Sequence, residues 1–330
     1  MLAFSLSEAK VSNLVFCAKK VTVYLINKLP DKSECVIIRI GGFKRAMVEL
    51  LNFWHLFFIF LISGSIVGMY FLLRNKTDAT KKWVLSALLF FNLALHFLKT
   101  TFPPYSTNTE LAMREMWFVN VCGTSVLFFP FIFISKSKVA KDYMVFLGII
   151  SGFLAMLYPT EAIGKSVLSL DLWRFYICHG TIIAVPMLTV LLKLHKLDVK
   201  RIWKMPICVC AMLLFIICNQ VLQSELGIIP LRNDDMLKVN FRNPSLIWGP
   251  TDDVAVVFSW LTPSFMKTVP VGAYAGQEKY WPFFWMVPGI IVYFILIPLL
   301  ICFIFDFKDT KNTFANLFKA LKIKKEPNDN

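Results

Sequence analysis

The sequence predicts an all-α, polytopic membrane helix bundle with about seven transmembrane helices. Of its 330 residues 57% are hydrophobic and only 17% are charged, and the mean hydropathy is +0.63. A soluble domain carries about 45–50% apolar and about 25% charged residues. The apolar residues are gathered in runs that approach the roughly 20 residues needed to cross a bilayer. The excess is therefore lipid-facing surface and not an oversized soluble core.

The apolar runs define seven expected spans and the polar segments between them. The spans are residues 52–73, 83–98, 116–135, 142–159, 172–194, 203–222 and 282–306, within a membrane domain of residues 47–306. Prolines inside spans indicate kinks, because neighbouring helices can satisfy the freed backbone groups. The long loop 223–281 before the last helix is expected outside the cell, as a re-entrant or lid-like cap. Trp281 and Trp285 then begin the last span as an aromatic belt.

The two termini are basic. Residues 1–46 carry eight Lys or Arg. Segment 11–30 is expected either to lie in the membrane interface as an amphipathic helix or to belong to an extension created by start-site choice. In the second case the native product begins at Met47. Residues 307–330 are predicted to form a basic cytoplasmic tail.

The formal charge of +14 is explained by loops that orient the protein. With their flanks, loops 74–82, 136–141 and 195–202 and the tail carry 18 Lys or Arg, whereas the opposite loops carry nine, five of them in the long loop. Short positively charged loops stay in the cytoplasm. The distribution predicts a plasma-membrane protein with a cytoplasmic C-terminus and residue 50 outside. The eight basic residues of the N-terminal extension oppose this orientation. We expect membrane lipids as partners, and no nucleic acid.

The cysteines indicate neither a disulfide framework nor a metal site. Six of the eight lie in apolar segments, which is not the pattern of a secreted disulfide-rich domain. Cys208 and Cys210 form C-x-C without a second pair that would complete a zinc site. We therefore expect no metal and no cofactor.

Polar side chains inside spans are costly in lipid, and each is a candidate functional residue. The candidates are His55, His96, Asn120, Cys122, Arg174, His179 and Asn219, and Trp281 and Trp285 join them as pocket residues. At a rise of 1.5 Å per residue, the seven polar candidates lie within roughly 5–12 Å of the external interface. The internal halves of the spans are expected to hold almost no ionisable residue, and no span a buried carboxylate. The pattern predicts one polar cavity near the external leaflet.

These residue types favour acyl transfer through a thioester. Cys122 is the expected nucleophile and His179 the general base, with Asn120 or Arg174 stabilising an oxyanion. The alternatives are a small-solute or lipid binding or transport protein without catalysis, and a structural subunit whose polar layer only fixes helix packing. Each candidate also has a structural interpretation, such as interhelical hydrogen bonding for Asn219 or anchoring at the headgroups for Arg174.

Several short motifs resemble one family of membrane proteins. They are Trp117-Phe-Val-Asn-Val-Cys122, Leu157-Tyr-Pro-Thr160, Trp173-Arg-Phe-Tyr-Ile-Cys-His179-Gly180 and Trp281-Pro-Phe-Phe-Trp285, with His55 early in the first span. They resemble the YwaF-like bacterial integral membrane family, which is related to transmembrane protein 164. In the eukaryotic branch, the resemblance implies acyl transfer onto lysophospholipid through a cysteine, and distant relatives hydrolyse fatty-acid esters with Thr and His.

The resemblance assigns roles by position. It carries the cysteine over to Cys122 and the histidine of the fifth span to His179. Bacterial members usually have His two residues before the Cys, where this chain has Asn120. The eukaryotic pattern has Asn there, but a Pro and a His where this chain has Val121 and Gly123.

Overall fold

The computed structural model describes residues 46–227, 245–250, 253–267 and 280–323. The chain divides into two compact units, Met1–Arg45 and Ala46–Asn330. The first unit, which includes the segment 11–30 expected to be amphipathic, lies outside the described residues. The account below concerns the second unit.

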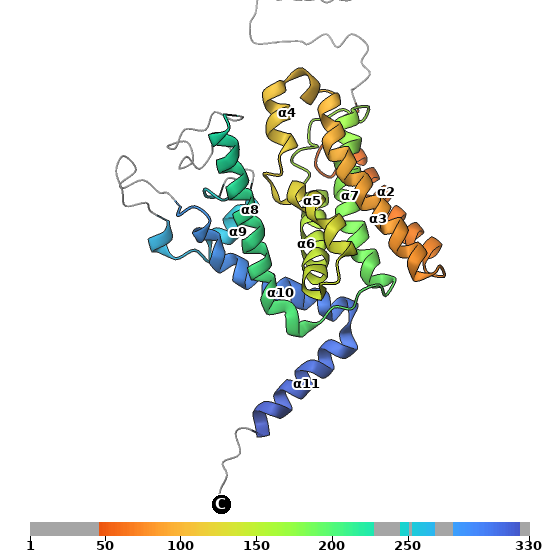
Figure 1. The fold of residues 1–330 in the computed structure, drawn as a ribbon, viewed down its shortest axis with the longest axis vertical. Helices are drawn as coiled ribbons and strands as arrows, with labels where there is room; N and C mark the ends of the chain where they lie inside the picture. Colours follow the sequence, from red (N-terminus) through yellow and green to blue (C-terminus); the bar gives the residue numbers. More distant parts are fainter. Residues whose placement is uncertain (1–45, 228–244, 251–252, 268–279, 324–330) are drawn as a thin grey trace, which may run out of the picture. The chain divides into compact units, whose positions relative to one another are not determined.

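The described part of the second unit is a bundle of α-helices (Figure 1). Its main helices are α2 (Phe53–Leu73), α3 (Asp78–Leu98), α5 (Val121–Ile134), α6 (Lys138–Leu157), α7 (Leu170–Leu191), α8 (Met205–Glu225) and α10 (Val287–Phe305). Six of them, some extended by a 3₁₀ turn, are long and apolar enough to cross a membrane, and α5 is a shorter apolar helix. The predicted all-α membrane bundle is confirmed, with a shortened third span.

Shorter elements connect these helices. They are the 3₁₀ turns η1 (Lys99–Thr101), η2 (Tyr105–Thr107), η3 (Val199–Lys204), η5 (Ser264–Met266) and η7 (Phe284–Met286), and the helices α4 (Thr109–Met116), α9 (Asp253–Ser259) and α11 (Phe307–Ile323). Helix α11 occupies most of the expected tail.

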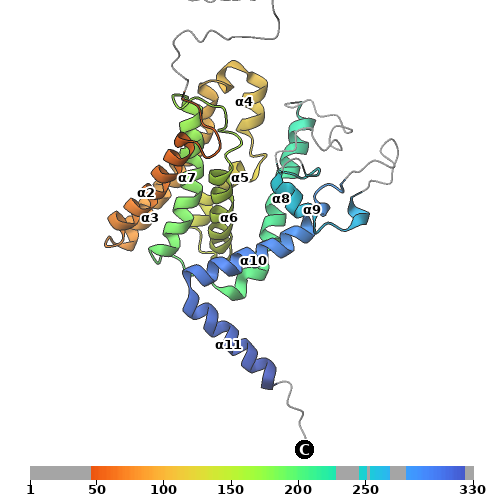
Figure 2. The ribbon, with the colours of Figure 1, turned by 180° about the vertical axis from the view of Figure 1, so that it is seen from behind.

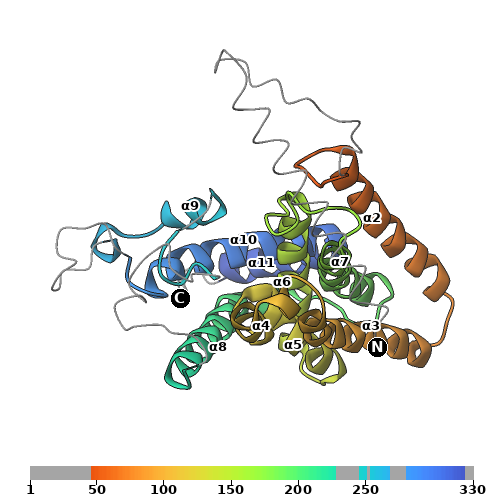
Figure 3. The same cartoon turned by 90° about the horizontal axis from the view of Figure 1, so that it is seen from above.

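Helix α7 packs against α2, α3, α5 and α6, and its contact with α6 is the most extensive between two of the described elements (Figure 3). Two glycines of α6 permit its close approach to α7. A Cβ atom on Gly148 would lie 2.7 Å from the carbonyl oxygen of Ile182, and one on Gly152 would lie 2.8 Å from the Cβ atom of Ile183. Small residues at helix contacts allow backbones to approach closely, which is how helices associate in lipid.

The second group of helices is formed by α8, α9 and α10. Helix α10 packs against α8 and η3 and crosses α8 (Figure 2), and α8 in turn contacts α5 and α6. Helix α9, part of the long segment expected to form a cap, packs on α10. The Tyr293 hydroxyl donates to the Val257 carbonyl oxygen at 3.0 Å, and Thr262 donates to the Trp285 carbonyl oxygen at 2.9 Å.

The helix starts are set by polar caps that hydropathy alone does not locate. Thr77 caps α3 and accepts a hydrogen bond from the Thr80 amide, so this helix begins five residues before the predicted span. Asn120 caps α5, so the third span begins at residue 121 and not at residue 116. Residues 117–120 form a turn that separates α4 from α5.

The expectation that no span contains a buried carboxylate is wrong. Asp142 in α6 is 0% exposed and Asp171 in α7 is 1% exposed. Asp171 lies in the first turn of α7 and Asp142 in the second turn of α6, and both helices begin earlier than predicted, at residues 170 and 138. Both are paired with cations, which is how membrane proteins offset the cost of burying a charge. Asp142 also overturns the expectation that the internal halves of the spans are almost free of ionisable residues.

The close contact between α6 and α7 predicts a difference between two glycine variants. Gly148→Ala should lower the free energy of unfolding by about 1–3 kcal/mol, because the added methyl group meets backbone. Gly64→Ala is the matched control, since a Cβ atom there has no neighbour within 4 Å. Thermal unfolding in detergent measures both. Equal melting temperatures for the two variants would contradict the described helix contact.

Candidate functional site

The turn before α5 is held on one side by His96, at the end of α3. A carbonyl oxygen only accepts, so the Nε2 atom of His96 donates to the Met116 carbonyl oxygen, at 3.1 Å. The His96 ring stacks on the Phe118 ring, with centroids 4.7 Å apart. The Cε1 atom of His96 lies 3.6 Å from the position of a Cβ atom on Gly123. His96 therefore lies against the first turn of α5.

Three further side chains bond the carbonyl groups of this turn. Asn219 of α8 donates to the Phe118 carbonyl oxygen at 3.2 Å, and Thr124 of α5 donates to the same oxygen at 3.3 Å. Ser245 donates to the Val119 carbonyl oxygen at 3.2 Å. Residues from α3, α5, α8 and the segment after α8 thus satisfy backbone groups that the helix break exposes.

Cys122 lies in the first turn of α5, behind the Asn120 cap. Asn120 Oδ1 accepts from the Gly123 amide at 2.6 Å, which leaves the Asn120 amino group as a donor. Among the described residues, the amide groups of Val121 and Cys122 have no acceptor. The first N–H groups of a helix and its macrodipole favour negative charge. The partly exposed Cys122 thiol therefore lies at the end of α5 that carries the positive partial charge.

His179 has one anchored and one available ring nitrogen. Nδ1 lies 2.9 Å from the Phe175 carbonyl oxygen and must donate to it. In the neutral ring the lone pair is then on Nε2, for which the described residues provide no partner. The ring is buried and lies against Phe175, with centroids 4.2 Å apart. A backbone-anchored imidazole of this tautomer is arranged as a base.

Glu161, in the exposed turn after α6, connects Cys122 and His179 electrostatically. Its negative charge acts on both groups in opposite ways, because it repels a thiolate on Cys122 and attracts an imidazolium on His179. Helices α5 and α7 also contact each other directly. Glu161 was not among the predicted residues because it lies in a loop and not inside a span.

His55 is placed as a structural link. The Leu51 amide donates to Nδ1 of His55 at 2.9 Å, so Nε2 carries the proton and donates to the Met156 carbonyl oxygen at 2.7 Å. The side chain is 0% exposed. Both nitrogens are used to join the start of α2 to the end of α6, which leaves none for a substrate.

Arg174 belongs to an ion cluster at the start of α7. Its Nε and Nη2 atoms donate to Oδ1 of Asp171 at 2.9 and 2.8 Å, and Nη2 also lies 3.4 Å from the Tyr105 hydroxyl. Lys165 pairs with the other oxygen of Asp171. Arg174 and Lys165 share this one carboxylate, so the cluster keeps one net positive charge.

The two tryptophans before α10 contact the segment that precedes them. Trp285 is 0% exposed, and its Nε1 atom donates to the carbonyl oxygens of Leu246 and Ile247 at 3.0 and 3.1 Å. The partly exposed Trp281 meets the Phe265 ring edge to face. Trp285 therefore fixes the segment that carries Ser245 and, through it, the turn before α5.

Several buried polar atoms at this end of the bundle have no partner in the part of the chain that the structure describes. They are Nε1 of Trp117, Oδ1 of Asn92, Oε1 of Gln220 and both amide atoms of Gln223. A buried polar group left unpaired costs about 1–3 kcal/mol. Water or the polar part of a ligand would remove this cost. Elsewhere among the described residues, no group of three or more His, Cys, Asp or Glu is arranged to hold a metal ion.

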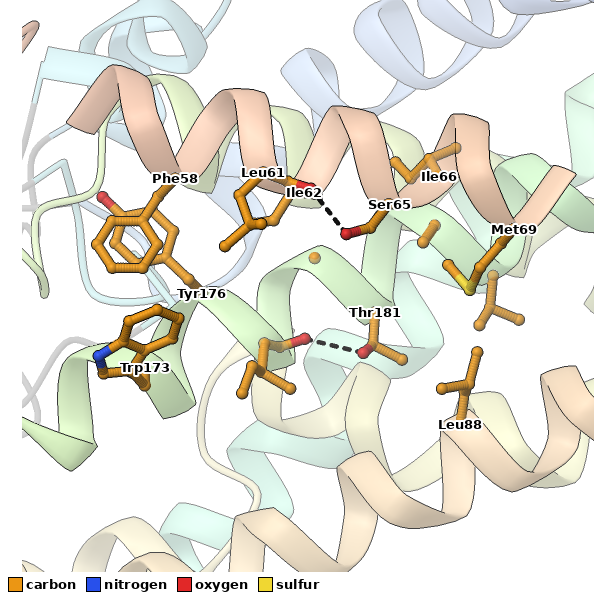
Figure 4. A pocket seen from close by; sticks show the side chains of 14 residues that line it. Phe58, Leu61, Ile62, Ser65, Ile66, Met69, Leu88, Trp173, Tyr176 and Thr181 are labelled. Atoms are coloured by element: carbon orange, nitrogen blue, oxygen red, sulfur yellow. Dashed lines mark hydrogen bonds between the residues drawn. The ribbon is translucent and has the colours of Figure 1, made fainter. Parts of the chain in front are cut away.

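An apolar pocket of about 180 Å³ lies between α2 and α7 (Figure 4). Phe58 and Tyr176 stack at its end, with ring centroids 4.1 Å apart. The Ser65 and Thr181 hydroxyls in its wall donate to carbonyl groups of their own helices at 2.7 and 2.8 Å. The pocket therefore offers hydrocarbon surface. Gly180 lines it directly after His179, which points away because consecutive helix residues diverge by about 100°.

Comparison with protein families identifies the family to which the chain belongs. The TMEM164 family matches residues 49–261, which is more than half of the chain and includes Cys122, Glu161 and His179. The chain belongs to the TMEM164 family. Membership and the apolar helices together make it a multi-pass membrane protein. Neither the curated proteins nor the solved structures contain a match to this TMEM164-family chain.

The ion cluster at the start of α7 predicts a large stability loss when its acid is neutralised. Asp171→Asn should cost about 3–5 kcal/mol, because two cations lose their buried counter-ion. Asp309→Asn is the control, since the Asp309 and Lys196 side chains are 46% and 71% exposed. An exposed pair contributes about 0–1 kcal/mol. Chemical denaturation in detergent checks this, and a comparable loss in both variants would disprove the buried role of Asp171.

Proposed function

We propose that this TMEM164-family protein is a membrane-embedded lipid acyltransferase, with Cys122 as nucleophile and His179 as general base. The observation that carries the proposal is the position of Cys122 in the first turn of a helix that begins inside the bundle. Two N–H groups without acceptors surround that position, and α5 packs on the helix that carries His179. The active site is then outward-facing, in a plasma-membrane protein with a cytoplasmic C-terminus.

The first half-reaction forms a thioester. Nε2 of His179 takes the proton of the Cys122 thiol, and the thiolate attacks the carbonyl carbon of a lipid ester. The C–O ester bond breaks, the leaving alkoxide takes the proton from the imidazolium, and a lysolipid departs. Cys122 then carries the acyl group.

The second half-reaction depends on the acceptor. The hydroxyl of a lysophospholipid gives its proton to Nε2 of His179 and attacks the thioester, which forms a new ester and returns the thiol. Water in the same position releases a fatty acid. Acyl transfer and ester hydrolysis are therefore two outcomes of one site, decided by which acceptor reaches the thioester.

Each tetrahedral intermediate carries an oxyanion that needs donors. The amide groups of Val121 and Cys122 and the amino group of Asn120 supply them at the positive end of α5. Glu161 stabilises the imidazolium that forms when His179 holds the proton. His96 and Asn219 act as positioning residues, because they hold the turn that places these donors.

Two features support a lipid as substrate. The polar atoms of Trp117 and Gln223 require polar partners, which a glycerol or headgroup supplies. The apolar pocket between α2 and α7 accommodates hydrocarbon. The same features also suit a lipid-binding or transport protein without chemistry, and turnover distinguishes the two functions. We also propose that the chain is related to the YwaF-like bacterial branch.

Removing the nucleophile should abolish acyl transfer without unfolding the protein. Cys122→Ala should lower lipid turnover in proteoliposomes by at least about 10³-fold, in the range expected when covalent catalysis is lost. Cys210→Ala is the matched control, as a second partly exposed thiol in a span. Mass spectrometry should find a hydroxylamine-sensitive acyl group on Cys122 and none in the variant. Full turnover by Cys122→Ala would end the proposal.

Substitution of the proposed base, His179, should reduce lipid turnover more than substitution of Glu161. His179→Gln should reduce turnover by about 10²–10⁴-fold, because general-base catalysis is worth that much. Glu161→Gln should reduce it less, and the loss should shrink at high salt if Glu161 acts through its charge. His55→Gln should lower stability but preserve the turnover of folded protein. Equal turnover losses in His55→Gln and His179→Gln would count against a special role for His179.

A further inference from the structure

Two adjoining cavities lie far from Cys122 along the helices, where α10 ends and α11 begins. One has a volume of about 550 Å³ and is lined mainly by polar and charged residues of segment 194–201 and α11. The other has about 730 Å³ and is lined largely by apolar residues of η3, α10 and α11. Val199, Lys200, Thr313 and Asn316 line both. Together they form one continuous depression with a polar and an apolar part.

A buried ion network fixes the polar part. Arg201 donates to both oxygens of Asp142 and to Asp198. Nε2 of His195 donates to Oδ1 of Asp142 at 2.7 Å. The Asp142 side chain is fully buried beneath these residues. The segment after α7 is thereby anchored to α6, so the cavity wall that it forms is held in place.

The remaining charges in this wall are predominantly positive. Lys196 pairs with Asp309. The hydrogen bond from its ammonium group to the Asp309 carboxylate raises the pKa of Lys196. Among the described residues, Lys138 and Lys200 have no ion pair, and Asp306 is the one lining acid without one. The lining carries four cations and three carboxylates, and the buried Asp142 balances the fourth cation. The attraction for a phosphate group therefore comes from the two unpaired ammonium groups of Lys138 and Lys200 and not from a net charge of the cavity.

The apolar part has the position and lining of an acyl-chain site. Ile295 and Leu299 of the apolar helix α10 form one wall, and Phe314 of α11 forms another. Trp203 completes it, with the Lys204 ammonium group 5.3 Å from the centre of its ring. Trp and Lys side by side are typical of the boundary between hydrocarbon and headgroups.

We propose that this depression binds one anionic phospholipid. The phosphate lies between Lys138 and Lys200, and the acyl chains lie along Trp203, Leu299 and Phe314. A free phosphate ion would use only the polar part and leave the apolar walls exposed to water, which favours a lipid as the occupant. The most positively charged loops lie at this end of the bundle, where anionic lipids are expected.

The bound lipid would secure α11 to the bundle. Helix α11 is held by the Lys196–Asp309 pair, by Thr310 donating to the Cys302 carbonyl oxygen at 3.3 Å, and by stacking of Phe314 on Phe303. A phospholipid in the depression adds contacts between η3, α10 and α11. The site does not include Cys122, so the test of lipid binding is independent of the test of acyl transfer.

Native mass spectrometry of the full chain released from nanodiscs tests the site. In mixed phosphatidylglycerol and phosphatidylcholine, the protein should retain one phosphatidylglycerol. Lys138→Gln with Lys200→Gln should reduce its retention about thirtyfold, because one Lys near an anionic lipid is worth about fivefold. Lys136→Gln with Lys311→Gln is the charge-matched control from the same end, outside the lining. Asp306→Asn should increase retention.

Several results would overturn the proposal. They are equal losses in the two double variants, equal retention of phosphatidylcholine, and displacement of the lipid by millimolar inorganic phosphate. A photoactivatable phosphatidylglycerol provides a readout in the unaltered protein. It should label peptides that contain Trp203 or Phe314, and labelling spread evenly over all lipid-facing helices would contradict a site. Leu299→Trp, which fills the apolar part, should abolish this labelling.

Discussion

The organisation of the candidate site depends on one constraint, that backbone groups released inside a helix bundle must find partners. The turn between α4 and α5 releases the carbonyl groups of Met116, Phe118 and Val119, and side chains from three separate parts of the fold, with Thr124 of α5 itself, bond them. The interruption is therefore stable, and α5 can begin within the bundle. Its free N–H groups and Cys122 are consequences of that interruption. Two residues expected to line a pocket, His96 and Asn219, instead make the break possible.

Hydropathy predicted the bundle well because six helices are long enough to be recognised by their apolar runs. It did not predict the break before α5. The apolar run continues through Val119 and Val121, and the start of α5 is marked in the sequence only by the Asn120 cap, whose Oδ1 atom accepts from the Gly123 amide. It also did not predict the burial of Asp142 and Asp171, which lie where apolar runs begin. The burial of Asp142 depends on Arg201, which is distant in sequence, and that of Asp171 depends on Lys165 and Arg174. Glu161 was missed because a loop residue has no periodic pattern.

The two ends of the bundle use charge differently. At the end with Cys122, the single carboxylate of Asp171 is shared by Lys165 and Arg174, so this ion cluster keeps one net positive charge. At the other end, Asp142 anchors Arg201 and His195. Lys138 and Lys200, which have no ion pair within the described ranges, line the cavity next to that anchor. The first arrangement suits covalent chemistry on an ester, and the second suits retention of a charged headgroup.

The central claim is that Cys122 accepts an acyl group whose carbonyl oxygen faces the start of α5. A cryo-EM map of the protein trapped with a fatty-acyl chloromethyl ketone tests it most directly. The account predicts density continuous with the Cys122 sulfur atom, and the carbonyl oxygen within hydrogen-bond distance of the Val121 or Cys122 amide. Density on another cysteine such as Cys218, or an adduct whose carbonyl group points away from α5 and from His179, would contradict it.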